Sequence, residues 1–199
     1  LRCNPQIACR SYLYYQEYAI AEKRLSALFA FDGLAYKNLD PWDFDDADLA
    51  FAQGHMAILS ALYGILRPLD AISPYRLDFM GRFRVEGRNL YAYWGDKVCR
   101  ALYERTDFAV NLASGEYEKL LRPHLQPKDR LVDCRFLVLR SGKYRNLATE
   151  AKMARGQMMG YLIRERVDRV EGLWDFHWNG YAFSPLQSDE CKLVFLKDN

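Results

Sequence analysis

The sequence contains no apolar stretch long enough to cross a bilayer, since a run of about 18 uncharged apolar residues occurs nowhere in it. It also lacks a visible signal peptide, an internal repeat, a low-complexity tract and a Gly/Ser linker. A chain of 199 residues, half of them apolar, is sufficient for one core. We therefore predict a cytoplasmic protein that folds as a single domain over residues 1–199 and has no membrane partner.

Cysteine and histidine are scarce, with 5 and 3 residues respectively. The cysteines are widely spaced without a C-x-x-C pair, and no two histidines have the spacing of metal ligands. This pattern argues against a zinc site and a disulfide framework, and it predicts reduced thiols with no metal and no cofactor. Cys134 lies in an apolar strand and is expected to be inert, whereas Cys9, beside Arg10, is the candidate for a reactive thiol.

Charge is nearly balanced overall, with a net charge of +2 and a pI of about 8.3. This pI is below the strongly basic range of a dedicated nucleic-acid domain. The distribution is uneven, because residues 1–54 carry −3 and the remainder carries +5. Such a field can orient an anionic partner, although a solvated surface without a partner has the same composition.

Apolar periodicity and turn residues predict an α+β fold, a mixed β-sheet packed by helices. One predicted helix begins at Pro5, and three more cover 43–54, 90–104 and 151–167. The predicted strands cover 26–31, 56–66, 108–112, 181–183 and 192–196, with a hairpin formed by 131–139 and 143–149. Four aromatic residues lie in apolar patterning and are expected to be largely buried: Tyr63, Trp94, Tyr117 and Phe195.

Charged and polar groups follow the apolar run 58–66, namely Arg67, Asp70, Tyr75 and Arg76. A rigid run fixes where such groups point, so charges at its end often line a binding site. The alternative is a structural ion pair between Arg67 and Asp70 beside the turn at Pro68.

The turn from Asn111 to Ser114 follows a predicted strand and begins a predicted helix, with Glu116 in its first turn. Free backbone N–H groups at such a start bind phosphate or carboxylate. An ordinary N-cap at Ser114 has the same sequence pattern, so both interpretations stay open.

The helix predicted at 151–167 places Lys152 and Arg155 one turn apart on the same face. These two residues form either part of a basic cleft or a solvated face. Gly156 and Gly160 are costly within a helix, by roughly 1 kcal/mol each relative to Ala. They therefore indicate close approach of another backbone or of a ligand.

Three motifs carry a resemblance to a known family. Residues 58–70 read ILSALYGILRPLD, residues 74–77 read PYRL, and residues 90–96 read LYAYWGD. Shorter matches follow in order at 111–117, 151–156, 180–183 and 193–195. The chain resembles the YaaA-like family of peroxide-stress proteins (UPF0246). The resemblance implies a YaaA-like α+β fold and a role in tolerance to hydrogen peroxide, through protection of DNA or restraint of free iron.

Two departures from the family pattern are visible. The usual first strand and the Ser-Pro-Ala-Lys-Thr segment are missing, so the chain is expected to begin some tens of residues into the pattern. The family also has a helix-hairpin-helix-like turn with glycine at its tip. The corresponding residues here are 6–10, and Cys9 stands where glycine would be.

Two functions therefore stay open. In the first, a basic cleft binds double-stranded DNA without sequence preference through phosphate contacts. In the second, the same cleft holds an anionic small molecule, with Asp70, Asp96 or Glu116 as acid–base groups. No nucleophile–base pair is legible, so no reaction can be named and binding is favoured over catalysis. The cleft residues shared by both hypotheses are Arg67, Asp70, Tyr75, Arg76, Asn111, Ser114, Lys152 and Arg155.

Overall fold

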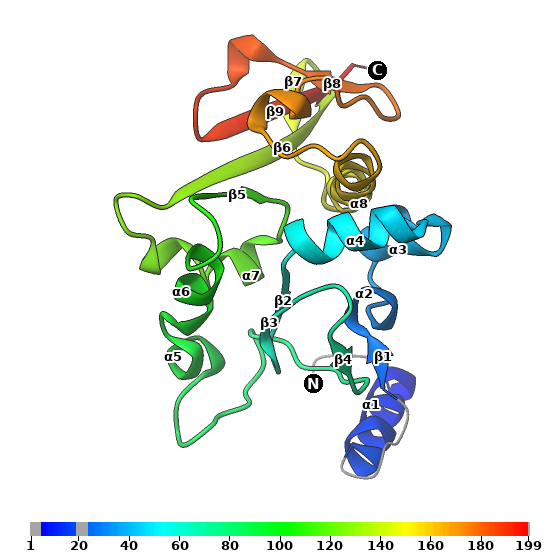
Figure 1. Cartoon of the computed structure of the whole chain (residues 1–199), viewed down its shortest axis with the longest axis vertical. Helices are drawn as coiled ribbons and strands as arrows, with labels where there is room; N and C mark the ends of the chain where they lie inside the picture. The colour runs from blue at the N-terminus through cyan, green and yellow to red at the C-terminus, as the bar shows by residue number, and fades with distance from the viewer. Residues whose placement is uncertain (1–4, 19–23, 199) are drawn as a thin grey trace. The chain divides into compact units, whose positions relative to one another are not determined.

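The computed structural model describes residues 5–18 and 24–198 (Figure 1). The fold is α+β with a mixed sheet packed by helices, as the sequence predicts. The chain divides into two compact units, each assembled from separate segments. Unit 1 comprises the residues up to 30, together with 56–105 and 113–126, and unit 2 comprises 31–55, 106–112 and the residues from 127 onward. A single domain over 1–199 stays a prediction.

Unit 1 is built from short elements. Its helices are α1 (Pro5–Glu17), α2 (Ala27–Ala30), α5 (Leu90–Trp94), α6 (Lys97–Tyr103), α7 (Gly115–Glu118) and the 3-10 helix η2 (Arg122–His124). Its strands are β1 (Leu25–Ser26), β2 (Ile58–Ser60), β3 (Gly64–Leu66) and β4 (Ala71–Ile72). Strands β1 and β4 form one antiparallel pair, and β2 and β3 form another.

The prediction of one buried strand over 56–66 is wrong, because β2 and β3 are the two arms of a hairpin. The turn between them is held by side chains. Ser60 Oγ accepts a hydrogen bond from the Tyr63 N–H at 2.8 Å, and Trp94 Nε1 donates to the Ala61 carbonyl oxygen at 3.0 Å. Gly64 has a φ of +77°, and a Cβ there would overlap the Trp94 ring.

Two further element predictions need correction. The helix predicted over 90–104 is interrupted at Gly95, which has a φ of +51° and donates its N–H to Tyr91 at 2.8 Å. The strand predicted over 26–31 is correct only at its first residue, because β1 ends at Ser26 and Ala27–Ala30 forms the short helix α2. Ala27 and Leu28 are fully buried there, so the apolar run marks burial rather than an extended chain.

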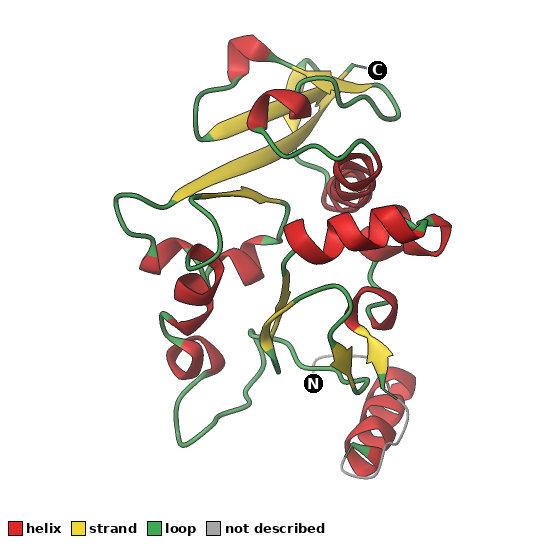
Figure 2. Ribbon diagram, viewed as in Figure 1, coloured by secondary structure: helices red, strands yellow, loops and turns green. Residues whose placement is uncertain are grey.

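Unit 2 contains the large sheet (Figure 2). Its strands are β5 (Phe108–Asn111), β6 (Arg130–Arg140), β7 (Lys143–Arg145), β8 (Tyr181–Phe183) and β9 (Lys192–Lys197). The order is β5-β6-β9-β8, with β7 paired to β6; β6 is parallel to β5 and β9, while β7 and β8 are antiparallel to their neighbours. Its helices are α3 (Leu34–Leu39), α4 (Asp46–His55), α8 (Ala148–Arg164), η1 (Pro41–Asp43), η3 (Val170–Leu173) and η4 (Pro185–Gln187).

The strands predicted for the second half of the chain are confirmed, including the hairpin around Ser141 and Gly142. The second arm of that hairpin, predicted over 143–149, is shorter than predicted, because β7 ends at Arg145 and α8 begins at Ala148. Both turn residues have positive φ, which matches the twist of a two-residue hairpin. Buried residues of β6 form one core with residues of α8 and with aromatic rings of the neighbouring strands. Phe136 of β6 is stacked on Phe195 of β9, with 5.3 Å between the ring centroids. Phe195 is fully buried, as predicted, whereas Tyr63, Trp94 and Tyr117 are only half-buried.

Helices α3 and α8 pack closely within unit 2, which confirms the interpretation of the two helix glycines. A Cβ on Gly156 would overlap the Ala35 carbonyl oxygen and stand 2.8 Å from Asn38 Cβ. A Cβ on Gly160 would lie 3.1 Å from the Leu39 carbonyl oxygen. The missing side chains therefore allow the backbone of α3 to approach α8.

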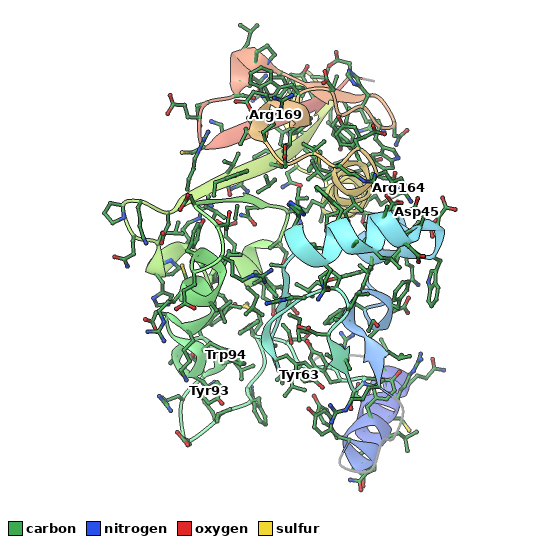
Figure 3. All side chains as sticks on the ribbon, viewed as in Figure 1. Asp45, Tyr63, Tyr93, Trp94, Arg164 and Arg169 are labelled. Carbon is green, nitrogen blue, oxygen red and sulfur yellow. The ribbon has the colours of Figure 1, made fainter. Side chains whose placement is uncertain are left out.

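The acidic residues that begin α4 have structural partners. The Asp45 carboxylate accepts from the Asp48 N–H at 2.7 Å, and the Asp48 carboxylate lies 3.2 Å from the guanidinium of Arg166. Arg164 stands above the Phe44 ring at 4.9 Å (Figure 3 labels Arg164 and Asp45). These contacts fit helix capping and ion pairing at the start of α4.

Candidate functional site

Arg67 and Asp70 are joined by hydrogen bonds to the backbone within the turn that follows β3. Asp70 Oδ2 accepts a hydrogen bond from the Arg67 N–H at 2.7 Å, and the Asp70 N–H donates to the Arg67 carbonyl oxygen at 3.2 Å. The alternative of an ion pair between the two side chains is therefore wrong. The Asp70 carboxylate instead binds the backbone N–H of Arg67 and closes the turn. The Arg67 side chain is exposed, and its charge faces solvent.

In unit 1, a network of hydroxyl groups joins the β2–β3 hairpin to residues 73–75. Ser60 Oγ and Tyr75 Oη are 2.7 Å apart, and Ser60 is fully buried. Tyr63 Oη accepts from the Ser73 N–H at 3.1 Å and receives the Tyr18 hydroxyl at 3.1 Å. Burial raises the pKa of Tyr75 to about 12, against the opposing effect of its bond to Ser60. The Tyr75 phenol therefore keeps its proton near neutral pH and acts as a hydrogen-bonding group.

Arg76 follows Tyr75 directly and has a buried donor without an acceptor. Its Nε–H is buried and finds no hydrogen-bond partner among the described residues. Its carbonyl oxygen accepts from Tyr15 Oη at 2.5 Å, so the backbone at this position is held. An unsatisfied buried donor costs about 1–3 kcal/mol, and more for a charged group. An oxyanion beside Arg76 would satisfy it.

Glu116, in the first turn of α7, is engaged by backbone donors. Its carboxylate accepts from the Phe79 N–H at 2.8 Å and from the Met80 N–H at 3.4 Å. Tyr91 Oη donates to the Glu116 carbonyl oxygen at 3.0 Å. Glu116 thus fixes the segment at 79–80. Ser114 occupies the N-cap position of α7 but makes no capping hydrogen bond with its side chain.

In unit 2, Asn111 is the last residue of β5 and is buried. Its Nδ2 donates to Asp133 Oδ1 at 2.8 Å on the neighbouring parallel strand, and Asp133 also pairs with Arg135 at 3.1 Å. The Asn111 amide therefore joins two strands. The resulting Asn–Asp–Arg contact set was not predicted, because the pairing register that creates it is not legible in the sequence.

Lys152 and Arg155 share α8 but differ in environment. Lys152 is exposed, whereas Arg155 is half-buried. Burial and the charge of Asp133 raise the pKa of the Cys134 thiol to about 12, while the nearby charges of Arg155 and Arg135 oppose this. Arg155 therefore lies near Cys134 of β6. Of the two α8 residues, Lys152 is the one that presents its charge to solvent.

The structure pairs the Tyr75 hydroxyl with Ser60 in unit 1, a contact that sequence reasoning missed, and Arg76 is the next residue along the chain. A serine inside an apolar strand is the signal that could have found it, because a buried hydroxyl requires a partner. Arg67 and Asp70 share the turn that follows β3. That all eight predicted residues converge on one cleft stays a prediction.

The four described cysteines are free thiols that differ in exposure. Cys9 and Cys191 are exposed, Cys99 and Cys134 are buried, and none of the four forms a disulfide; Cys3 lies outside the described residues. Over 5–18 and 24–198, no group of three or more His, Cys, Asp or Glu side chains is placed to hold a metal ion. No helix in this part of the chain is long and apolar enough to cross a membrane.

Comparison with known proteins agrees with the family resemblance of the sequence motifs. A family model described as "Peroxide stress protein YaaA" matches residues 1–187. A UPF0246 protein of Limosilactobacillus reuteri (strain DSM 20016) is 40% identical over 194 residues, covering 97% of this chain and 78% of that protein. A UPF0246 protein of Saccharophagus degradans is 42% identical over 177 residues, covering 86% and 69%. One from Ligilactobacillus salivarius is 35% identical over 198 residues, covering 99% and 80%.

Proposed function

The chain belongs to the YaaA family of peroxide stress proteins, and on that basis we propose that it protects against hydrogen peroxide by binding double-stranded DNA. The contacts are to phosphates, so binding is independent of sequence. The proposed contact residues are Arg67, Arg76, Lys152 and Arg155, and the proposed site of action is the cytoplasm.

One observation carries this proposal. Asp70 uses its carboxylate on the backbone N–H of Arg67, so the adjacent carboxylate does not neutralise the exposed guanidinium. Lys152 likewise presents its charge to solvent from the long helix α8. Exposed cations on fixed elements are the groups that replace counterions on a phosphate backbone.

Fluorescence anisotropy with a mixed-sequence duplex of about 20 base pairs tests the proposal. The variant Arg67→Ala/Lys152→Ala should weaken binding and reduce the slope of log K against log salt by about 2, since each lost phosphate contact contributes about 0.9. The control Arg100→Ala/Lys192→Ala removes the same charge, one from each unit, at exposed residues paired with acids. Equal effects of the two variants would overturn the proposed contacts.

Restraint of free iron is the other route that the family resemblance implies. It would require a cluster of side chains able to hold the metal. No such cluster is found among the described residues, and restraint of iron stays a prediction of the resemblance beside the DNA proposal.

A second candidate function, binding of a small oxyanion, is favoured by Arg76. Its guanidinium Nε–H is buried without an acceptor, and a charged N–H donor of this kind recognises phosphate or carboxylate. Inorganic phosphate should raise the melting temperature of the chain above that in sodium chloride of equal ionic strength. It should also shift the Arg76 Nε–H resonance, and Arg76→Gln should abolish the rise. Equal melting temperatures in the two salts would remove this candidate.

A further inference from the structure

The segment between β4 and α5 carries a cluster of exposed cationic and apolar side chains in unit 1. Residues 80–88, here called the arginine loop, include Arg82, Arg84 and Arg88, all exposed. Met80 and Phe83 are also exposed, by 71% and 53%. Figure 1 draws this part of unit 1 as a long coil that extends beyond α5. Exposed large apolar side chains next to cations mark an interaction surface.

The arginine loop is fixed where it begins. Glu116 accepts the Phe79 and Met80 N–H groups, as described above. The Phe79 ring is buried, stacked on Tyr91 at 4.8 Å and edge-on to Tyr117 at 5.4 Å between centroids. The exposed side chains that follow thus project from an anchored base.

The end of the loop is also fixed. Val85 and Arg88 exchange two backbone hydrogen bonds of 2.9 Å, which closes a tight turn at Glu86 and Gly87. Asn89 then caps α5, with its Oδ1 accepting from the Ala92 N–H at 2.9 Å. An anchored loop loses less conformational entropy on binding than a disordered one.

The charges within the loop are unequal in their availability. Arg88 pairs with Glu86 at 2.7 Å and stands over the Tyr93 ring, which Figure 3 labels beside Trp94. Arg84 donates only to the neighbouring Phe83 carbonyl oxygen, at 3.3 Å. Within the described chain, no carboxylate lies at ion-pair distance from Arg82 or Arg84. These two guanidinium groups are therefore the available cations.

We infer that the arginine loop is a duplex-DNA contact of this protein, an inference that rests on the proposed function and adds a contact surface to it. Arg82 and Arg84 bind phosphates, and Phe83, between them in the chain, packs against the sugars and bases of the adjacent groove. Apolar side chains flanked by cations make this kind of contact with the minor groove. Two exposed apolar side chains offer little area for a lipid surface, which favours DNA over an anionic membrane.

Three variants of the full chain test the inference in the anisotropy assay. Arg82→Ala/Arg84→Ala should reduce the salt slope by about 2, because two phosphate contacts are lost. The control Arg100→Ala/Arg105→Ala removes the same charge from exposed residues of the same unit and should leave the slope unchanged. Phe83→Ala should weaken binding roughly tenfold at constant slope, because it removes an apolar contact and no charge. Thermal unfolding confirms that each variant is folded.

The outcomes separate the two proposals. If the wild type binds duplex but the loop variant and its control weaken binding equally, the loop contact is wrong while DNA binding stands. If the wild type binds no duplex at low salt, both are overturned. Binding to phosphatidylserine vesicles without binding to duplex would also overturn the loop as a DNA contact and assign it to a membrane surface.

Discussion

The carbonyl oxygen of Ala35, in α3, lies where a side chain on Gly156 of α8 would stand. Both residues belong to unit 2, and the absence of a Cβ lets the two helices touch along their backbones. Met158 of the same helix is fully buried against the sheet, so α8 is covered on more than one side. The position of α8, and with it that of Lys152, depends on this contact.

Gly156→Ala should therefore destabilise the protein, by about 1–3 kcal/mol as expected for overpacking, despite the better helix propensity of alanine. The matched control is Gly54→Ala in α4, where a Cβ would meet nothing within 4 Å. That change should be neutral or stabilising by up to about 1 kcal/mol. Urea unfolding of both variants measures the difference. Equal stabilities would contradict the close approach of α3 and α8.

Stability should fall at alkaline pH. Burial raises the pKa of Tyr75, Tyr181 and Cys134 to about 12 in the folded chain. Their ordinary pKa values are 10.0 for tyrosine and 9.0 for cysteine. Because the folded state holds these protons more tightly, its stabilisation is complete below the ordinary values and is lost as pH rises toward about 12. Urea midpoints between pH 8 and 11 should decline, less steeply in Tyr75→Phe than in the exposed control Tyr12→Phe.

Reaction with peroxide should distinguish the cysteines by exposure. Cys9 and Cys191 are exposed, whereas Cys134 is buried with a raised thiol pKa. Thiolate character and access control oxidation, so dilute hydrogen peroxide with a sulfenic-acid trap should label Cys9 and Cys191 before Cys134. Mass spectrometry of the folded and the urea-unfolded chain gives the comparison. Labelling of Cys134 in the folded chain at the rate of Cys191 would contradict its burial.

Local patterns in the second half of the chain were sufficient to predict its elements. The Ser141–Gly142 turn between two apolar arms and the long helix with Ala151, Ala154 and Met158 on its buried face follow from short-range rules. The break of the helix at Gly95 had a signal in its glycine, but the apolar spacing across it favoured one helix.

The hairpin of β2 and β3 could not be predicted by the same rules. Its turn consists of Ala61, Leu62 and Tyr63, which are not typical turn residues. It is held by Ser60 from within and by Trp94 from a distant helix, so tertiary contacts determine it. The candidate site shows the same limit, because Asn111 meets Asp133 only through the pairing register of β5 and β6.

The most direct test of the central proposal is the salt dependence of duplex binding by the unmodified chain. Anisotropy titrations with mixed-sequence and scrambled duplexes, at about 50, 100 and 200 mM salt, give the slope of log K against log salt. We expect equal affinities for the two sequences and a slope of about −3 or steeper, from at least three or four phosphate contacts. No binding at the lowest salt, or an affinity that does not change with salt, would contradict the account.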